Sequence, residues 1–175
     1  MTQRQEFKVL QKFDDFELRE YAPCVLAEVK NSGQYANATS SAFGSLFRYI
    51  SKGNQASAKI AMTAPVIAAQ DEKSTKQDWS VSFVMPAGSK LQEMPQPTDP
   101  HVTLREIDKE KCVAISFRGR ATEELANKKI NQLRASAAKQ NIKLSDETRI
   151  CRFDPPFKPG LLHYNEIVIP VLLGE

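Results

Sequence analysis

The sequence predicts an α+β fold: a duplicated β-β-α-β-β repeat whose strands form a distorted antiparallel β-barrel with two long α-helices. Three observations support this prediction: a strand-like segment occurs twice, an amphipathic helical pattern follows each copy, and further strand patterns follow each helix. With 175 residues, of which 41% are hydrophobic, the chain is long enough for one well-buried core. We therefore expect a single domain over residues 1–175, with repeat one at about 16–86 and repeat two at about 102–173.

The repeated segment is ELREYAPCVLAEVKNSG at 17–33 and TLREIDKEKCVAISFRG at 103–119. Both copies contain Leu-Arg-Glu, a turn, Cys-Val and an alternating run that ends in glycine. When Cys24 is placed on Cys112, apolar residues of the two copies coincide at every second position, as on one face of a strand. Each copy therefore predicts two strands, which we expect to form an antiparallel hairpin across the turn.

A helical pattern follows each of these segments. In repeat one, residues of one face recur every three or four positions, namely Thr39, Phe43, Leu46, Phe47 and Ile50. In repeat two, Thr122 is a favourable N-cap. The stripe that follows it consists of Ala126, Ile130, Leu133 and Ala137. Both helices are therefore expected to pack one face on the sheet.

Strand patterns follow both helices. WSVSFVM at 79–85 alternates large apolar residues with mostly serine, which is typical of a sheet with one solvated face. Its counterpart in repeat two is YNEIVIPVLL at 164–173, which we expect to pair with RICRF at 149–153. The Pro-rich segment MPQPTDP at 94–100 joins the two repeats.

Charge and composition exclude several classes of partner. The chain has 24 basic and 21 acidic residues, and no stretch concentrates basic residues with aromatic ones, so we do not expect a nucleic-acid partner. No apolar run is long enough to span a membrane, and the N-terminus lacks a secretory signal, so no membrane contact and a cytoplasmic location are expected. The oligomeric state has no signature in the sequence. Cys24, Cys112 and Cys151 lie in strand-like contexts and are expected to be reduced and largely buried.

The sequence contains no recognisable catalytic motif. It lacks a Gly-rich phosphate loop, a nucleophile elbow and a Cys/His grouping for zinc, so we expect no catalytic residue and no metal site. A Cys-His nucleophilic pair is formally possible, but nothing in the sequence brings His101 or His163 to one of the cysteines. Glu20 and Glu106 occupy equivalent places in the two repeats and are candidates for acid–base chemistry, although acids in such strands are usually the outward face.

Four motifs fall in the order seen in one known family. LREYAP, KIAMTAPV, FVMP and FDPPFKPGLLHYNEIVI together resemble the SOUL haem-binding protein family, and the resemblance extends from about residue 16 to about residue 171. It implies a distorted β-barrel of two repeats with two long helices, related to the gyrase-inhibitor-like superfamily. It also implies a non-enzymatic haem or tetrapyrrole carrier or buffer. In this fold we expect Met62 and Val66 to face the core and Pro65 to fix a bend.

The resemblance also implies where a non-covalently bound haem would lie. Relatives hold the porphyrin on an apolar surface of the first helix, where two methionine positions correspond to Phe43 and Phe47. A basic position of that helix corresponds to Ser40, whereas Lys158 retains a basic residue after Asp-Pro-Pro. Glu20 replaces the histidine that is proposed to ligate iron, so weak or absent axial ligation is expected.

Other interpretations remain open from the residues alone. Phe43 and Phe47 also fit the core stripe of their helix. The chain is alternatively a gyrase-inhibitor-like module that senses or binds another flat apolar compound. A third hypothesis is a hydrolase of a reactive small molecule that uses Glu20 or Glu106.

Overall fold

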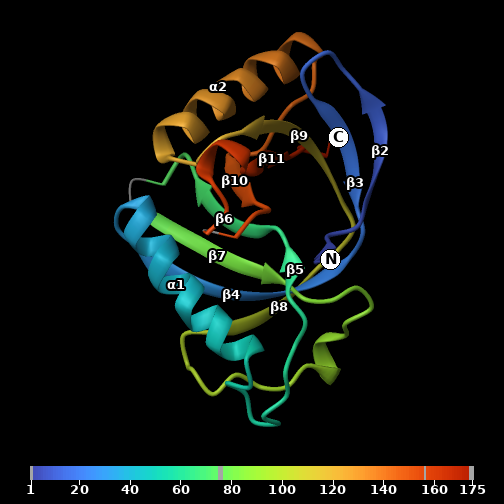
Figure 1. Ribbon diagram of the computed structural model, residues 1–175. Helices are drawn as coiled ribbons and strands as arrows, with labels where there is room; N and C mark the ends of the chain where they lie inside the picture. The colour runs from blue at the N-terminus through green and yellow to red at the C-terminus, as the bar shows by residue number, and fades with distance from the viewer. Residues whose placement is uncertain (1, 75–76, 156, 174–175) are drawn as a thin grey trace.

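One large curled sheet and two helices make up the fold. The structure is a computed structural model that describes residues 2–74, 77–155 and 157–173. In this part of the chain nine strands form an antiparallel sheet in the order β2-β3-β9-β11-β10-β6-β7-β4-β8. The helices α1 (Tyr35–Ile50) and α2 (Glu123–Lys139) lie outside the curve of the sheet (Figure 1). The predicted α+β fold with a duplicated β-β-α-β-β unit is confirmed.

The two repeats contribute matching sets of strands. Repeat one supplies β3 (Glu17–Tyr21), β4 (Cys24–Ser32), β6 (Val66–Asp71) and β7 (Asp78–Val84). Repeat two supplies β8 (Thr103–Ile107), β9 (Glu110–Arg118), β10 (Glu147–Arg152) and β11 (Tyr164–Pro170). The edge strand β2 (Phe7–Lys12) is extra, and β1 (Gln3–Arg4) pairs in parallel with β5 (Thr63–Ala64). Apart from β2, the sheet is symmetric about its centre. From one edge inward the strands are β3, β9, β11 and β10, and from the other edge inward they are the counterparts from the other repeat, β8, β4, β7 and β6.

The predicted hairpins are wrong. Strand β3 pairs with β9, and β4 pairs with β8, so each repeat pairs with the other instead of folding back on itself. The pairing between the two repeats continues on both sides of the bend at residues 22–23: Tyr21 is paired with Glu110 before the bend, and Cys24 is paired with Ile107 after it. A two-residue hairpin turn needs a residue with positive φ, and no described residue at 22–23 or 108–109 has one. Both segments therefore bend the chain without reversing it.

Curling of the sheet buries both of its faces. Helix α1 packs on β4 and β7, and α2 packs on β9 and β11, around one apolar core. The face away from the helices, here called the inner face, carries a second apolar cluster of Tyr21, Leu26, Ile67, Val84, Cys112, Ala114, Cys151 and Val168. The solvated face predicted for 79–85 is therefore wrong: Ser82 and Val84 are buried on the inner face, because both halves of the curled sheet turn this face toward one another.

The helices differ in how well the sequence predicted their buried faces. The stripe of α2 is confirmed, and the hydroxyl of Thr122 accepts a hydrogen bond from the Leu125 amide at 3.2 Å. In α1, Thr39, Leu46 and Ile50 are buried as expected, but the stripe also includes Tyr35, Ala38, Ala42 and Tyr49. Phe47 lies outside it and is 51% exposed. No helix in the described part of the chain is long and apolar enough to cross a membrane.

The segment that contains Pro65 has the packing role that was expected. Thr63–Ala64 forms β5, and Val66 begins the central strand β6 directly after the proline. Val66 belongs to the core, and Met62 is half-buried against it. The proline thus stands at the boundary between two strands, where its missing N–H leaves no gap in the ladder.

Candidate functional site

Phe47, the most exposed aromatic side chain of α1, stacks on the ring of Phe43. The rings of Phe43 and Phe47 stack with centroids 6.0 Å apart and planes 13° apart. Phe43 in turn meets the buried ring of Phe83 edge-on at 5.3 Å. Phe43 therefore anchors the pair in the core while Phe47 presents its ring to solvent, so the core-stripe interpretation does not apply to Phe47.

Small residues lie beside this aromatic pair. Helical spacing places Ser40 and Gly44 on the same side of α1, three or four positions from the rings. We call Ser40, Phe43, Gly44 and Phe47 the α1 surface. Serine and glycine have short side chains or none, so neither places a bulky side chain of its own next to the aromatic pair. A flat ligand can approach such a surface closely.

A guanidinium that the sequence analysis did not single out borders the α1 surface. The Nη1 atom of Arg48 lies 3.6 Å from the point where a Cβ atom on Gly44 would stand. Its Nη2 donates to the hydroxyl of Ser45 at 3.2 Å. The basic residue directly after Phe47 was visible in the sequence, but its direction along the helix surface was not.

The structure separates Glu20 from the α1 surface. Glu20 lies on β3 and forms an ion pair of 3.3 Å with Lys8. Its strand neighbours only β2 and β9, whereas α1 packs on β4 and β7. Glu20 also points to the opposite face of β3 from Arg19 and Tyr21, because side chains alternate along a strand.

Lys158 is held within the loop that follows β10. Its Nζ atom lies 2.9 Å from Asp154, whose other carboxylate oxygen accepts a hydrogen bond of 2.6 Å from the amide of Tyr164. The Tyr164 amide first, and Lys158 second, hold the pKa of Asp154 below its usual value. Lys158 therefore already has a carboxylate partner.

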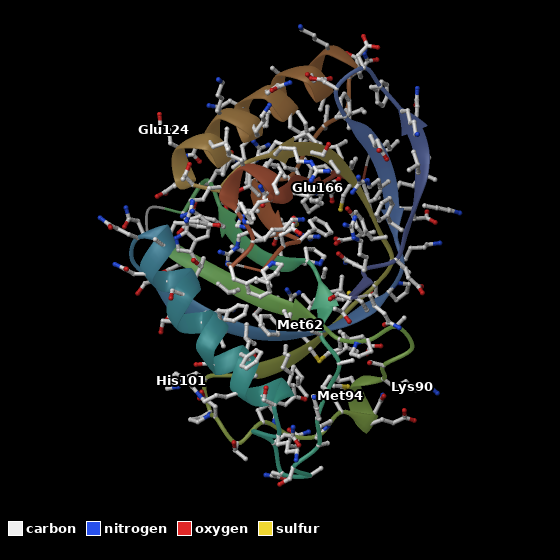
Figure 2. The ribbon with its side chains drawn as sticks, viewed as in Figure 1. Met62, Lys90, Met94, His101, Glu124 and Glu166 are labelled. Carbon is white, nitrogen blue, oxygen red and sulfur yellow. The ribbon has the colours of Figure 1, made fainter. Side chains whose placement is uncertain are left out.

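The two histidines have different surroundings. The Nε2 atom of His163 lies 2.7 Å from the carbonyl oxygen of Lys158, so this ring is tied to the loop. The ring of His101 is 79% exposed, with Nδ1 3.1 Å from Asp99. Figure 2 shows His101 beside α1. His101 is therefore the imidazole near α1, which the motif pattern had not indicated.

A buried ion pair occupies the inner face. The guanidinium of Arg19 donates to both carboxylate oxygens of Glu166, at 2.9 and 2.8 Å, and both residues are buried. Glu166 also accepts a hydrogen bond of 2.6 Å from the hydroxyl of Tyr164, and Arg19 donates one of 3.0 Å to that of Tyr21. Figure 2 shows Glu166 inside the curve of the sheet.

The protonation states of this cluster follow from its contacts. Burial by itself would lower the pKa of Arg19, but the hydrogen bonds and charge of Glu166 outweigh it, so the pKa is raised. Burial, together with the bond to Glu166, raises the pKa of Tyr164 to about 12, and burial also raises the pKa of Tyr21. The guanidinium is therefore charged and both phenols are neutral at pH 7.

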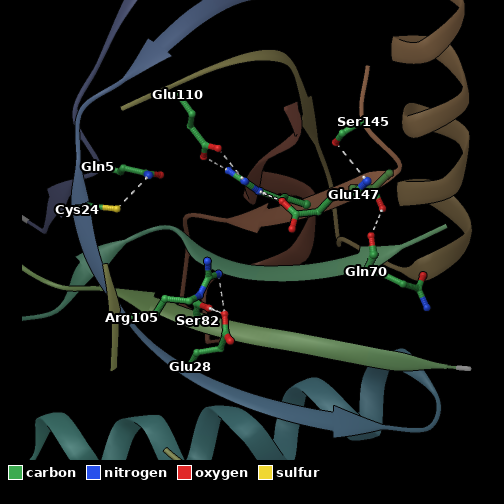
Figure 3. A network of polar contacts seen from close by, with 11 residues as sticks. Gln5, Cys24, Glu28, Gln70, Ser82, Arg105, Glu110, Ser145 and Glu147 are labelled. Atoms are coloured by element: carbon green, nitrogen blue, oxygen red, sulfur yellow. Dashed lines mark hydrogen bonds and ion pairs between the residues drawn. The ribbon is translucent and has the colours of Figure 1, made fainter. Parts of the chain in front are cut away.

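Other inner-face carboxylates also have arginine partners. Arg149 donates to Glu110 and to Glu147, and Arg105 donates to Glu28 at 2.9 Å (Figure 3). Each buried or half-buried acid just named therefore has an arginine partner, and Arg149 shares its single positive charge between Glu110 and Glu147.

The cysteines also belong to the inner face. All three are free, Cys112 and Cys151 are buried, and Cys24 is half-buried with a 3.9 Å contact from the side-chain amide of Gln5 (Figure 3). Burial raises the pKa of Cys112 to about 12 and raises that of Cys151 as well. The prediction of largely buried, unpaired thiols is confirmed, with Cys24 the most accessible of the three.

Two hollows in the described part of the chain lie away from the α1 surface. One of about 50 Å³ is bordered by Arg4, Cys24 and Thr63. The other, of about 450 Å³, lies near the end of α2 and is bordered by Lys12, Asp15 and other residues. Neither of these two hollows includes Phe43 or Phe47. Because Phe47 is half-exposed, a ligand stacked on it would lie on an exposed face.

Comparisons with known proteins agree with this architecture. The C-terminal domain of EcmrR has a TM-score of 0.69 at 14% identity, over 91% of this chain and 98% of that one. A hydrolase from Listeria innocua has a TM-score of 0.60 at 11% identity, over 93% and 94% of the two chains. SAV2435, described as bound to tetraphenylphosphonium, has a TM-score of 0.50 at 9% identity, over 90% and 94%. At these identities the likeness concerns the fold alone.

The sequence comparison is more specific. No curated protein sequence matches the chain. The SOUL heme-binding protein family matches it over residues 2–170, which is nearly the whole length. The resemblance carried by the LREYAP, KIAMTAPV, FVMP and FDPPFKPGLLHYNEIVI motifs is thereby confirmed, and the chain belongs to the SOUL heme-binding protein family.

Proposed function

We propose that the protein is a non-enzymatic carrier or buffer that binds haem or a related tetrapyrrole without a covalent bond. The ligand lies on the α1 surface, with its plane against Phe47. The observation that carries this proposal is the exposed ring of Phe47, stacked on a core-anchored Phe43 in a chain of this family.

Apolar contact supplies most of the binding free energy in this proposal. Each 100 Å² of apolar surface removed from water contributes about 2.5 kcal/mol before the costs of association are subtracted. Stacking on an aromatic ring adds about 0.5–1.5 kcal/mol. Haem also carries two propionates, and Arg48 supplies a charged donor beside the rings where Ser40 has none.

Iron contributes little in this proposal. Glu20 lies on a strand remote from α1, and His163 is hydrogen-bonded within its own loop. Lys158 has Asp154 as its partner and acts on a propionate only if that ion pair opens. Haem supplies an iron centre, but in this proposal the α1 surface binds its ring and Arg48 binds a propionate.

A haem titration tests the proposal. The wild-type protein should give a saturable shift of the Soret band with one equivalent of haem. Phe47→Glu should abolish it, because the substitution places an unpaired charge against an apolar ligand. Phe157→Glu is the matched control, since Phe157 is 89% exposed and lies on another element. Equal haem affinity of Phe47→Glu and Phe157→Glu would contradict the proposal.

A second candidate is a small-molecule site on the inner face, or hydrolysis there. It is favoured by two neighbours of this fold, one described as a hydrolase and one as bound to tetraphenylphosphonium. The pairing of Glu166 with Arg19 argues against hydrolysis, because Glu166 would have to give up this ion pair before its carboxylate accepted a proton from a substrate or a water molecule. Saturable binding of tetraphenylphosphonium, or ester hydrolysis lost in Glu166→Gln, would support this candidate instead.

A further inference from the structure

The loop between β10 and β11 exposes an unusual amount of apolar surface. This β10–β11 loop covers residues 153–163. Phe157 is 89% exposed, Leu161 is 88% exposed and Leu162 is 55% exposed. Three large apolar side chains so close together in the sequence and so open to water usually indicate a contact with something apolar.

Hydrogen bonds hold this loop in place. Besides the contacts of Lys158 and His163 described above, the amide of Leu162 donates to the carbonyl oxygen of Pro159 at 2.9 Å. The carbonyl oxygen of Leu162 accepts a hydrogen bond of 3.2 Å from Arg118. These hydrogen bonds tie the described residues 158–163 to one another and to β9.

The base of the loop is positively charged. The guanidinium of Arg120 lies beside Gly160, with Nε 3.2 Å from the point where a Cβ atom would stand. In the part of the chain that the structure describes, neither Arg118 nor Arg120 has a carboxylate partner. Asp154, the acid bonded within the loop, is already paired with Lys158.

We propose that the β10–β11 loop docks the protein on an anionic lipid surface. Phe157, Leu161 and Leu162 enter the boundary between headgroups and acyl chains, while Arg118 and Arg120 meet lipid phosphates. Exposed apolar side chains close to guanidinium groups that have no carboxylate partner among the described residues are the combination that favours the interface of an anionic bilayer. This peripheral contact differs from a membrane span, and it departs from the expectation that the chain makes no membrane contact. It does not depend on haem binding.

Vesicle co-sedimentation of the haem-free 175-residue protein tests the proposal. The protein should sediment with phosphatidylglycerol vesicles, bind phosphatidylcholine vesicles more weakly, and dissociate as NaCl is raised. Phe157→Ser and Leu161→Ser should each weaken binding about tenfold, because a buried apolar side chain is lost from the interface. Arg120→Gln removes a charge that has no carboxylate partner among the described residues, and it should weaken vesicle binding about fivefold at low salt.

Leu173→Ser is the matched control. Leu173 is 84% exposed, but it lies beyond the far end of β11, and its substitution should leave vesicle binding unchanged. Unchanged thermal unfolding of each variant shows that an effect is not a loss of folding. No binding to anionic vesicles, or equal binding by Leu161→Ser and the wild type, overturns the proposal. Self-association that Leu161→Ser abolishes, without vesicle binding, assigns the loop to an interface between copies and also overturns it.

Discussion

Arg19 and Glu166 form a two-bond ion pair between strands that are not neighbours in the sheet. Arg19 lies on β3 and Glu166 on β11, with β9 between them, and the residues are 147 positions apart in the sequence. The long arginine side chain crosses the inner face above Cys112 and Ala114 of β9, which are on the same face. The pair thus links the beginning of the first repeat to the end of the second.

Removal of one partner of this pair should destabilise the fold. Arg19→Met leaves the buried carboxylate of Glu166 without its cation, and we expect the free energy of unfolding to fall by about 3–5 kcal/mol. Lys8→Met, which removes a partner of an exposed ion pair, should cost no more than about 1 kcal/mol. Urea unfolding measures both. A double variant, Arg19→Met with Glu166→Leu, should regain most of the loss, and failure to regain any would contradict this explanation.

The free energy of unfolding should fall in alkaline solution, because buried cysteine thiols stay protonated in the folded protein. Burial raises the pKa of Cys112 from 9.0 to about 12, so the unfolded chain loses this proton first. This contribution to stability is complete below pH 9 and is lost as the pH rises toward 12. Urea unfolding between pH 8 and pH 12 should therefore show a shallower decline for Cys112→Ala than for the wild type. An identical slope for the two proteins would exclude Cys112 as a cause.

Porphyrin binding should not require iron. Because contact with Phe47 is apolar and His163 is tied to its loop, iron-free protoporphyrin should bind about as tightly as haem. Fluorescence quenching measures the first affinity and the Soret shift measures the second. His163→Ala should change neither. A low-spin haem spectrum that disappears in His101→Ala or His163→Ala would show that an imidazole ligates the iron.

Two glycines should respond in opposite ways to alanine. At Gly53 a Cβ atom would lie 2.4 Å from the backbone oxygen of Arg48, so Gly53→Ala should lower the free energy of unfolding by about 1–3 kcal/mol. At Gly44, inside α1, the nearest atom would be 3.6 Å away. Gly44→Ala should therefore raise the free energy of unfolding by about 0.5–1 kcal/mol, since alanine is the better helix former. Thermal unfolding of the two variants distinguishes these signs.

Local patterns in the sequence were enough to identify the elements of each repeat. The alternation around Cys24 and Cys112 predicts strands, and the Thr122 cap begins α2, because both signals depend on hydrogen bonds and side-chain spacing within a few residues. The family motifs likewise identified the family without any structure. The boundaries of the single domain and its repeats stay predictions, as do the haem-binding roles of Phe43, Phe47, Ser40, Lys158 and Glu20.

Tertiary structure alone decided which strands pair and which side chains meet. The same strand pattern fits a hairpin within one repeat or pairing between strands of the two repeats. Which of the two forms depends on whether residues 22–23 and 108–109 reverse the chain or only bend it. That choice places Arg19 near Glu166 and turns Ser82 inward. The exposure of Phe47 depends on how α1 rotates on β4 and β7, which is set by the volumes of the residues packed beneath it. Contacts between segments distant in the sequence leave no periodic signal in either one, so only the folded chain reveals them.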